Sequence, residues 1–193
     1  QGNGSVEAGA PATLEMLERE VDEVPPELAI LDGSGLSTLN RVSARSMISL
    51  LSFMARSPMW ETYWSTLPEA GVSAGLRRMQ RTPAERNLRA KTGTINNVSA
   101  LSGYVRARND EVLAFAIISN DVPSTWRAKR VEDAIGARLP GFDRPRKGSL
   151  YHLLRCALLN NGVDCSMNHG WVSAMHAEED LERTVKGYSS AFG

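Results

Sequence analysis

Apolar and polar residues alternate most regularly in the middle of the chain. Residues 98–105 and 112–119 are rich in β-formers and alternate or run apolar, and the polar residues 106–110 lie between them. Two such runs joined by a short polar turn indicate a hairpin. Residues 86–94, which precede them, are more polar and predict an exposed edge strand. The pattern therefore predicts a three-strand antiparallel meander.

Apolar residues at helical spacing predict helices on both sides of this meander. The predicted helices cover residues 13–21, 43–56, 59–67 and 126–139. Ser43 and Ser124 are suited to cap two of them. The first ten residues are expected to form a loop, with Pro11 near the first helical turn. A short apolar run at 28–31 is a further strand candidate.

These elements indicate an α+β domain in which helices pack on an antiparallel sheet. A basic, proline-containing stretch follows the last helix, and domain boundaries often fall in such segments. We therefore expect a domain over residues 1–143, a linker over 144–148 and a C-terminal segment over 149–193. That segment contains helical patterns and a strand candidate at 171–175, which predict a small α/β appendage.

Composition narrows the functional classes. The 193 residues carry 22 basic and 22 acidic side chains, so the formal net charge is zero. Nucleic-acid and membrane-surface binding depend on a cationic face, so neither is expected. No apolar run approaches the ~20 residues that span a bilayer. The first ten residues lack the pattern of a signal peptide, so the chain is expected to be cytoplasmic as expressed.

The cysteines and histidines predict neither a disulfide scaffold nor a metal site. Cys156 and Cys165 are too few for such a scaffold and are expected to be free thiols. The three histidines fit no common zinc spacing. We therefore expect no metal and no cofactor. Four arginines between positions 77 and 86 are interpreted as a solvated face, with attraction of anionic substrates toward the neighbouring strand as the alternative.

The candidate chemistry of the meander lies on its first strand, at Lys91, Thr92, Gly93 and Thr94. A lysine ammonium beside a threonine hydroxyl makes a site for a carboxylate, and glycine lets another backbone approach closely. Two neighbouring backbone N–H groups could also serve an oxyanion. The expected partner is therefore a small-molecule or peptide carboxylate ligand.

The glycine-rich stretch at 32–37 lacks the ending of a P-loop and the spacing of a dinucleotide fingerprint, which favours a structural turn. Ser37 and Asn40 could line a cleft, or Asn40 could stabilise a turn while Ser43 caps the following helix. Ser34, Ser37, Asn40 and Ser99 are the candidate cleft residues.

Three motifs occur in order: Asp-Gly-Ser-Gly-Leu-Ser at 32–37, Ala-Lys-Thr-Gly-Thr at 90–94 and Val-Ser-Ala-Leu-Ser-Gly-Tyr-Val at 98–105. Together, over about residues 1–143, they resemble the penicillin-binding D-alanyl-D-alanine carboxypeptidases, serine hydrolases related to β-lactamases. The resemblance implies a truncated form of that fold and an exported family. It also implies that Lys91, Thr92 and Thr94 bind the substrate carboxylate and help to form the oxyanion hole.

The chain departs from this family at the nucleophile. The family uses the serine of a Ser-x-x-Lys motif, supported by a Ser-x-Asn motif, because a nearby lysine must remove the serine proton. No serine here is followed by lysine three positions later, and the one Ser-x-Asn lies in the tail at 166–168. The parental reaction is therefore expected to be lost, unless Ser34, Ser37 or Ser99 substitutes as nucleophile.

The tail has a second resemblance, carried by Tyr-His-Leu-Leu at 151–154, Leu-Leu-Asn-Asn-Gly-Val at 158–163 and Ser-Ala-Met-His-Ala-Glu-Glu-Asp at 173–180. These stretches resemble the C-terminal end of class III pyridoxal-phosphate aminotransferases, close to glutamate-1-semialdehyde aminomutase. That family's Schiff-base lysine and phosphate loops lie far upstream of this region, so no cofactor site is carried over.

The two resemblances indicate a chimera and leave three functional hypotheses. The chain could be a remnant of a penicillin-recognising hydrolase, a non-catalytic oligomerising fragment, or a chimera with a new activity in a dimer-interface pocket. Faces exposed by truncation favour association. We therefore expect a two-fold homodimer whose candidate interface residues are Trp60, Trp64 and the tail helices.

Overall fold

The computed structural model describes residues 4–21, 28–108, 110–142 and 172–175. Its elements, in chain order, are α1 Val6–Glu20, α2 Ala44–Arg56, α3 Trp60–Thr66, the 3₁₀ turn η1 Ala74–Leu76, β1 Arg89–Ile95, β2 Val98–Arg106, β3 Val112–Asn120, α4 Thr125–Arg138, the 3₁₀ turn η2 Leu139–Gly141 and β4 Val172–Met175. The helices and the sheet give the predicted α+β class.

The predicted meander is confirmed. The strand order is β1-β2-β3-β4, and the first three strands pair antiparallel. β1 therefore lies at an edge of the sheet. It begins at Arg89 rather than at Arg86, because Arg86 has a φ of 59° and the amide of Asn87 donates to Ala84 O in a turn.

The strand predicted at 171–175 is present as β4, which pairs in parallel with β3. The remaining predicted elements of the C-terminal segment lie outside the described residues, as do Cys156, Cys165 and the three histidines. The domain boundaries, the appendage and the aminotransferase resemblance therefore stay predictions.

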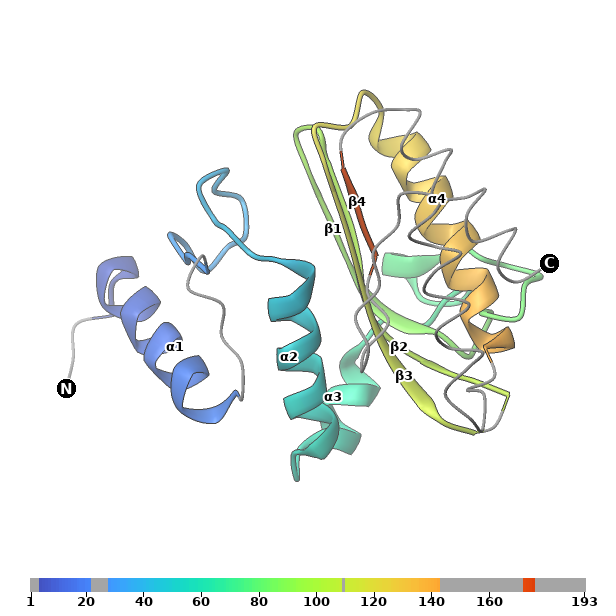
Figure 1. Ribbon diagram of the computed structural model, residues 1–193, viewed down its shortest axis with the longest axis horizontal. Helices are drawn as coiled ribbons and strands as arrows, with labels where there is room; N and C mark the ends of the chain where they lie inside the picture. The colour runs from blue at the N-terminus through green and yellow to red at the C-terminus, as the bar shows by residue number, and fades with distance from the viewer. Residues whose placement is uncertain (1–3, 22–27, 109, 143–171, 176–193) are drawn as a thin grey trace, which may run out of the picture.

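Helices cover both faces of the sheet, with α2 and α3 on one side and α4 on the other (Figure 1). Beneath α4, the core contains Leu88, Leu101, Ile117 and Ile135, each at most 3% exposed. The other core lies beneath α2 and α3 and is centred on Tyr104. The side-chain alternation of β2 supplies both cores, since successive side chains of a strand point to opposite faces.

Three aromatic side chains of α3 pack around Tyr104. The rings of Trp60 and Tyr104 meet edge to face with centroids 4.8 Å apart, and Trp64 and Tyr63 complete the cluster. The Tyr104 hydroxyl donates to Leu51 O at 2.7 Å. Burial raises the pKa of Tyr104. Trp60 and Trp64 are half-buried in this core.

The helix caps were predicted more accurately than the N-terminus. The side chain of Ser43 accepts from the Ser46 amide at the start of α2, and that of Ser124 accepts from the Arg127 amide at the start of α4. The prediction of a loop over the first ten residues is wrong. α1 begins at Val6, because the side chain of Ser5 caps it, and Pro11 lies inside the helix rather than near its first turn.

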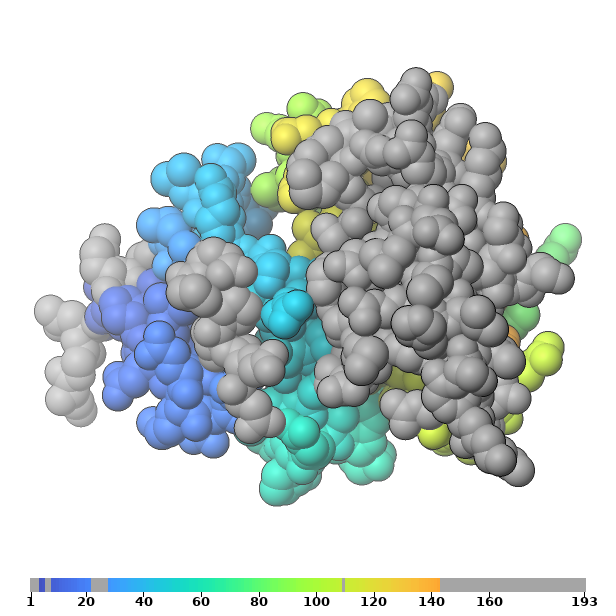
Figure 2. All heavy atoms as spheres, viewed as in Figure 1, coloured from blue at the N-terminus to red at the C-terminus, as the bar shows by residue number. Residues whose placement is uncertain are grey.

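The N-terminal part forms a lobe beside α2, seen in blue in Figure 2. The strand candidate at 28–31 is reduced to an isolated bridge between Ala29 and Arg41. None of the described helices has both the length and the apolar character needed to cross a membrane. The described residues also contain no group of three side chains that could hold a metal ion.

Candidate functional site

β1 carries the four predicted ligand-binding residues. Ala90 is buried in the core beneath α4, and alternation along the strand places Thr92 and Thr94 on the same face. Lys91 and Gly93 therefore lie on the opposite face, the one that α2 and α3 cover. Lys91, Gly93 and Thr94 are exposed and Thr92 is half-buried, so this half of the strand is accessible from outside.

The outer edge of β1 is paired at its start and open further along. The Ala90 amide donates to Pro68 O at 3.0 Å, on the edge away from β2. Since successive residues direct their main-chain groups to alternate edges of a strand, Thr92 and Thr94 also face the outer edge. Within the described residues, no main-chain hydrogen bond continues the outer pairing beyond Ala90. An extended ligand could therefore bind the N–H and C=O groups of Thr92 and Thr94.

The side chain of Lys91 folds toward this open edge. Its Nζ donates to the carbonyl oxygen of Thr92, which is one of the outward-facing main-chain groups. The ammonium therefore lies beside the groups that an extended ligand would use. A charge-assisted bond from this ammonium is about twice as strong as a neutral one, so a carboxylate is the ligand group best suited to it.

A buried polar network lies beneath the end of this strand. Ser99 is opposite Thr94 in the β1–β2 register and is fully buried. Its hydroxyl donates to Glu132 Oε1 on α4 at 2.6 Å. Arg78 completes the network by donating to Glu132 Oε2 at 2.7 Å. The network ties α4 and the loop before β1 to the part of β2 that supports Thr94.

Asp133, next to Glu132, also contacts Arg78, with Oδ1 3.2 Å from the guanidinium Nε. Burial raises the pKa of Asp133, the charge of Arg78 opposes this rise, and the charge of Glu132 adds to it. Arg78 is only 21% exposed, so for this arginine the interpretation as a solvated face is wrong. It neutralises two carboxylates of α4.

Sequence reasoning missed Glu132, although a signal was present. Ala128, Glu132 and Ile135 lie at helical spacing on one face of α4, and the two apolar members are buried. A single acidic residue on an apolar face of a helix indicates a paired carboxylate rather than a solvated one.

The glycine-rich loop is organised around Asp32. Its carboxylate accepts hydrogen bonds from the Ser34 hydroxyl at 2.7 Å, the Asn40 side-chain amide at 2.7 Å and the Ser37 amide at 3.1 Å. Asn40 in turn accepts from the Leu31 amide at 2.7 Å. The hydrogen bond from Ser34, followed by that from Asn40, lowers the pKa of Asp32. These contacts agree with a structural turn.

The structure brings together only part of the predicted site. Lys91, Thr92, Gly93 and Thr94 share one strand, but among the described residues no hydrogen bond joins Ser34, Ser37 or Asn40 to them. Ser34 and Ser37 instead accept from the amides of Leu36 and Leu39. Ser99 lies near Thr94 but is buried on the α4 face. The catalytic role of all these residues stays a prediction.

Known proteins are similar to this chain in sequence and in fold. The chain is 37% identical over 154 residues to a D-alanyl-D-alanine carboxypeptidase of Actinomadura sp. (strain R39). This alignment covers 76% of this chain and 28% of that protein. It is 38% identical over 117 residues to a carboxypeptidase of Mycolicibacterium smegmatis, and this alignment covers 57% of this chain and 25% of that protein. The chain thus spans about a quarter of the length of these relatives.

A solved structure of a penicillin-binding protein is similar to this chain in fold. Penicillin binding protein 4 from Haemophilus influenzae, complexed with a β-lactam, superimposes with a TM-score of 0.51 and 28% sequence identity, over 57% of this chain and 26% of that one. Residues 1–139 match the D-Ala-D-Ala carboxypeptidase 3 (S13) family. That match covers most of the chain, which therefore belongs to this carboxypeptidase family.

Proposed function

We propose that this chain carries the carboxylate-binding strand of a D-Ala-D-Ala carboxypeptidase site. The observation that carries the proposal is the open outer edge of β1, where the Lys91 ammonium lies beside the main-chain groups of Thr92. In this arrangement Lys91 pairs with the terminal carboxylate of an extended peptide or of a β-lactam. The Thr92 hydroxyl adds a donor to that carboxylate, and the Thr94 N–H faces the carbonyl oxygen that becomes an oxyanion.

We further propose that these 193 residues bind such ligands without being acylated by them. Acyl transfer needs a serine that a neighbouring base deprotonates, and the sequence contains no Ser-x-x-Lys. The hydroxyls of Ser34 and Ser37 are engaged in the Asp32 loop, and that of Ser99 donates to Glu132 inside the core. The geometry supports recognition of a carboxylate more strongly than hydrolysis.

A pair of peptides tests the binding step. One ends in D-Ala-D-Ala with a free carboxylate, and the other has the same sequence with a C-terminal amide. Titration followed by NMR is expected to show the acid binding about tenfold more tightly, since one charge-assisted bond contributes roughly 1.4 kcal/mol. Lys91→Gln is expected to abolish the difference, whereas Lys129→Gln, on α4, leaves it unchanged. Equal binding of the acid and the amide to the unaltered chain would contradict the proposal.

Incubation with a fluorescent penicillin tests the chemical step. We expect denaturing electrophoresis and intact mass to show no covalent adduct. Circular dichroism verifies that the protein is folded before the incubation. An adduct mapped to a serine peptide would overturn the proposal that the chain is not acylated. It would also identify the substitute nucleophile.

Self-association is a second proposed role, favoured by exposed apolar side chains in the loop before α2. Leu36 and Leu39 are 71% and 61% exposed, and Leu31 and Val42 are each 46% exposed. Apolar side chains concentrated in one segment favour association. Analytical ultracentrifugation is expected to show a dimer that Leu36→Ser combined with Leu39→Ser weakens. A monomer at every accessible concentration would rule this role out.

A further inference from the structure

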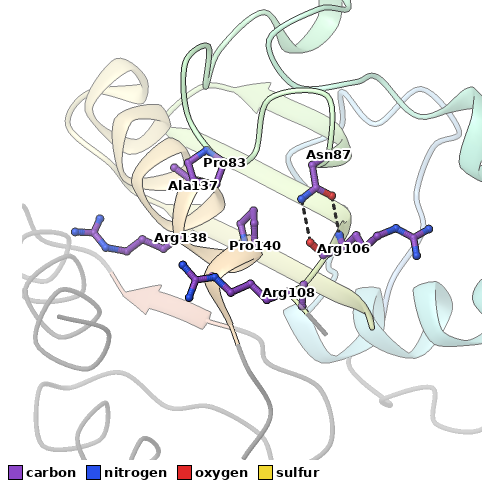
Figure 3. A pocket seen from close by; sticks show the side chains of 9 residues that line it. Pro83, Asn87, Arg106, Arg108, Ala137, Arg138 and Pro140 are labelled. Carbon is purple, nitrogen blue, oxygen red and sulfur yellow. Dashed lines mark hydrogen bonds between the residues drawn. The ribbon is translucent and has the colours of Figure 1, made fainter. Parts of the chain in front are cut away.

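Figure 3 shows a cavity of about 600 Å³ at the end of β2 that contains Arg106. The Lys91 site lies toward the other end of this strand, since Lys91 to Thr94 pair with residues 99–102. Three parts of the chain form it: the turn before β1, the end of β2 with the residue pair that follows, and the end of α4 with η2. Its lining residues are Pro83, Asn87, Arg106, Ala107, Arg108, Ala137, Arg138, Pro140 and Gly141. The volume is within the range of small-molecule sites.

Hydrogen bonds hold the backbone on one side of this cavity. The side chain of Asn87 makes two hydrogen bonds to the main chain of Arg106, donating to its carbonyl at 2.9 Å and accepting from its amide at 3.0 Å. The Ala107 amide donates to Glu111 O at 2.8 Å and closes the hairpin. Ala107 and Pro140 are buried. These contacts hold the main chain on this side of the cavity in place, so less of it has to be ordered when a ligand binds.

The charge of the lining has one sign. It includes three arginines and no acidic side chain. Figure 3 shows the side chains of Arg108 and Arg138 extending to the same side, whereas that of Arg106 points away from them. The Arg106 guanidinium instead lies 3.4 Å from the carbonyl oxygen of Asp110. Two of the three positive charges therefore gather at one side of the cavity.

We propose that this cavity binds a small phosphate-bearing molecule through Arg108 and Arg138. A phosphate has several acceptor oxygens and a negative charge between one and two at neutral pH, so it can accept from the Arg108 guanidinium while the positive charge of Arg138 attracts it. Arg138 also has contacts of its own, so its main contribution is charge, and Arg108 supplies the donors. The partial negative charge at the end of α4 opposes an anion, and Arg138 in the last turn offsets it.

The site is separate from the proposed carboxylate site. It is formed by the end of β2 and by the end of α4, and none of its lining residues belongs to β1. Binding of phosphate here and of a peptide carboxylate at Lys91 can therefore be measured independently. Failure of one proposal leaves the other standing.

Inorganic pyrophosphate is the probe for this site, titrated into the full chain at low salt and followed by NMR. We expect saturable shifts of Ala107, Arg108 and residues 137–141. Arg108→Gln is expected to weaken binding about tenfold, because it removes the hydrogen-bond donors, and this factor corresponds to roughly 1.4 kcal/mol. Arg138→Gln removes mainly charge and is expected to weaken binding about threefold. Arg106→Gln is the matched control, because it removes the same charge from the lining but points away, and it is expected to change the affinity less than about twofold.

Three results would overturn the proposal. The first is the absence of saturable binding to the unaltered chain. The second is an equal loss in all three arginine variants, which would indicate attraction by net charge alone. The third is binding of citrate as tight as that of pyrophosphate, which would remove the preference for phosphate. The shift map of the unaltered chain keeps the test decisive even where a variant folds poorly.

Discussion

The two halves of β1 differ in how the rest of the protein holds them. Ala90, near its start, and Leu88, just before it, are completely buried. The start of the strand is paired on both edges, with residues 68–70 on one side and β2 on the other. From Lys91 onward, β2 is its only pairing partner among the described residues, and the strand is mostly exposed. One continuous strand thus joins a fixed, buried segment to an open edge.

The difference shows how a binding edge can be rigid without being covered. An edge strand with unpaired main-chain groups invites another chain to pair with it, so its position must be fixed from elsewhere. Here the fixed half of β1 sets the direction of the strand, and the Ser99–Glu132 bond supports β2 directly opposite Thr94. Changes to the buried support should therefore cost stability, whereas changes to the exposed half should mainly affect ligand binding.

The largest effect is expected at Gly103, which pairs with Ala90 in the fixed half. A methyl group there would lie 2.1 Å from the carbonyl oxygen of Arg89 and 2.6 Å from the Cα atom of Ala90. Because backbone atoms cannot move aside, Gly103→Ala is expected to lower the free energy of unfolding by about 4 kcal/mol. Urea denaturation measures this change.

Gly93→Ala is the matched control in the open half of the strand. Its methyl group would lie 3.5 Å from the Cβ atom of Ala100, an ordinary contact. The free energy of unfolding is expected to change by less than about 1 kcal/mol. Similar losses for the two alanine variants would mean that the two halves of β1 are held alike.

Glu132→Ala is expected to have the next largest effect. It removes the acceptor of the Ser99 hydroxyl and one partner of Arg78, which is only 21% exposed. Removing one partner of a buried pair costs about 3 kcal/mol in the free energy of unfolding. Amide hydrogen exchange at the start of β2 should also become faster, because this is where Ser99 supports Thr94.

Glu132→Gln separates the two functions of this carboxylate. The amide oxygen can still accept from Ser99, but the charge that pairs with Arg78 is lost. The free energy of unfolding is therefore expected to fall less than in Glu132→Ala. Stability of Glu132→Ala within about 0.5 kcal/mol of the unaltered chain would show that the network does not support the sheet.

The smallest effect is expected from the titration of Asp133. Burial raises its pKa above the ordinary value of 3.8, so the folded chain holds this proton more tightly than the unfolded chain. The stability that this proton gives is complete below pH 3.8 and is lost as the pH rises through the raised pKa. Asp133→Asn should remove this decline, which is expected to be small because the charge of Arg78 opposes the rise of the pKa. Chemical denaturation across the acid range measures the free energy of unfolding against pH for the unaltered chain and for Asp133→Asn. Parallel pH profiles for the two proteins would contradict a raised pKa at Asp133.

Local sequence signals predicted much of the fold. Alternation fixed the three antiparallel strands to within a few residues, and Ser43 and Ser124 marked the starts of α2 and α4. Alternation and capping involve neighbours in the chain, so they can be read without knowing the tertiary contacts. The same signals failed at α1, where Ser5 rather than Pro11 determines the start of the helix.

The sequence by itself determined that Lys91, Thr92, Gly93 and Thr94 share one edge strand and that the chain resembles the carboxypeptidase family. Only the tertiary structure decided which side of that strand is open, because the pairing of residues 68–70 with the start of β1 is a long-range contact. It also decided that Ser99 is a buried donor to Glu132, 33 residues away in the chain. The helical pattern of α4 marks Glu132 as a paired carboxylate, but only the packing of α4 on the sheet brings Ser99 to it as a partner.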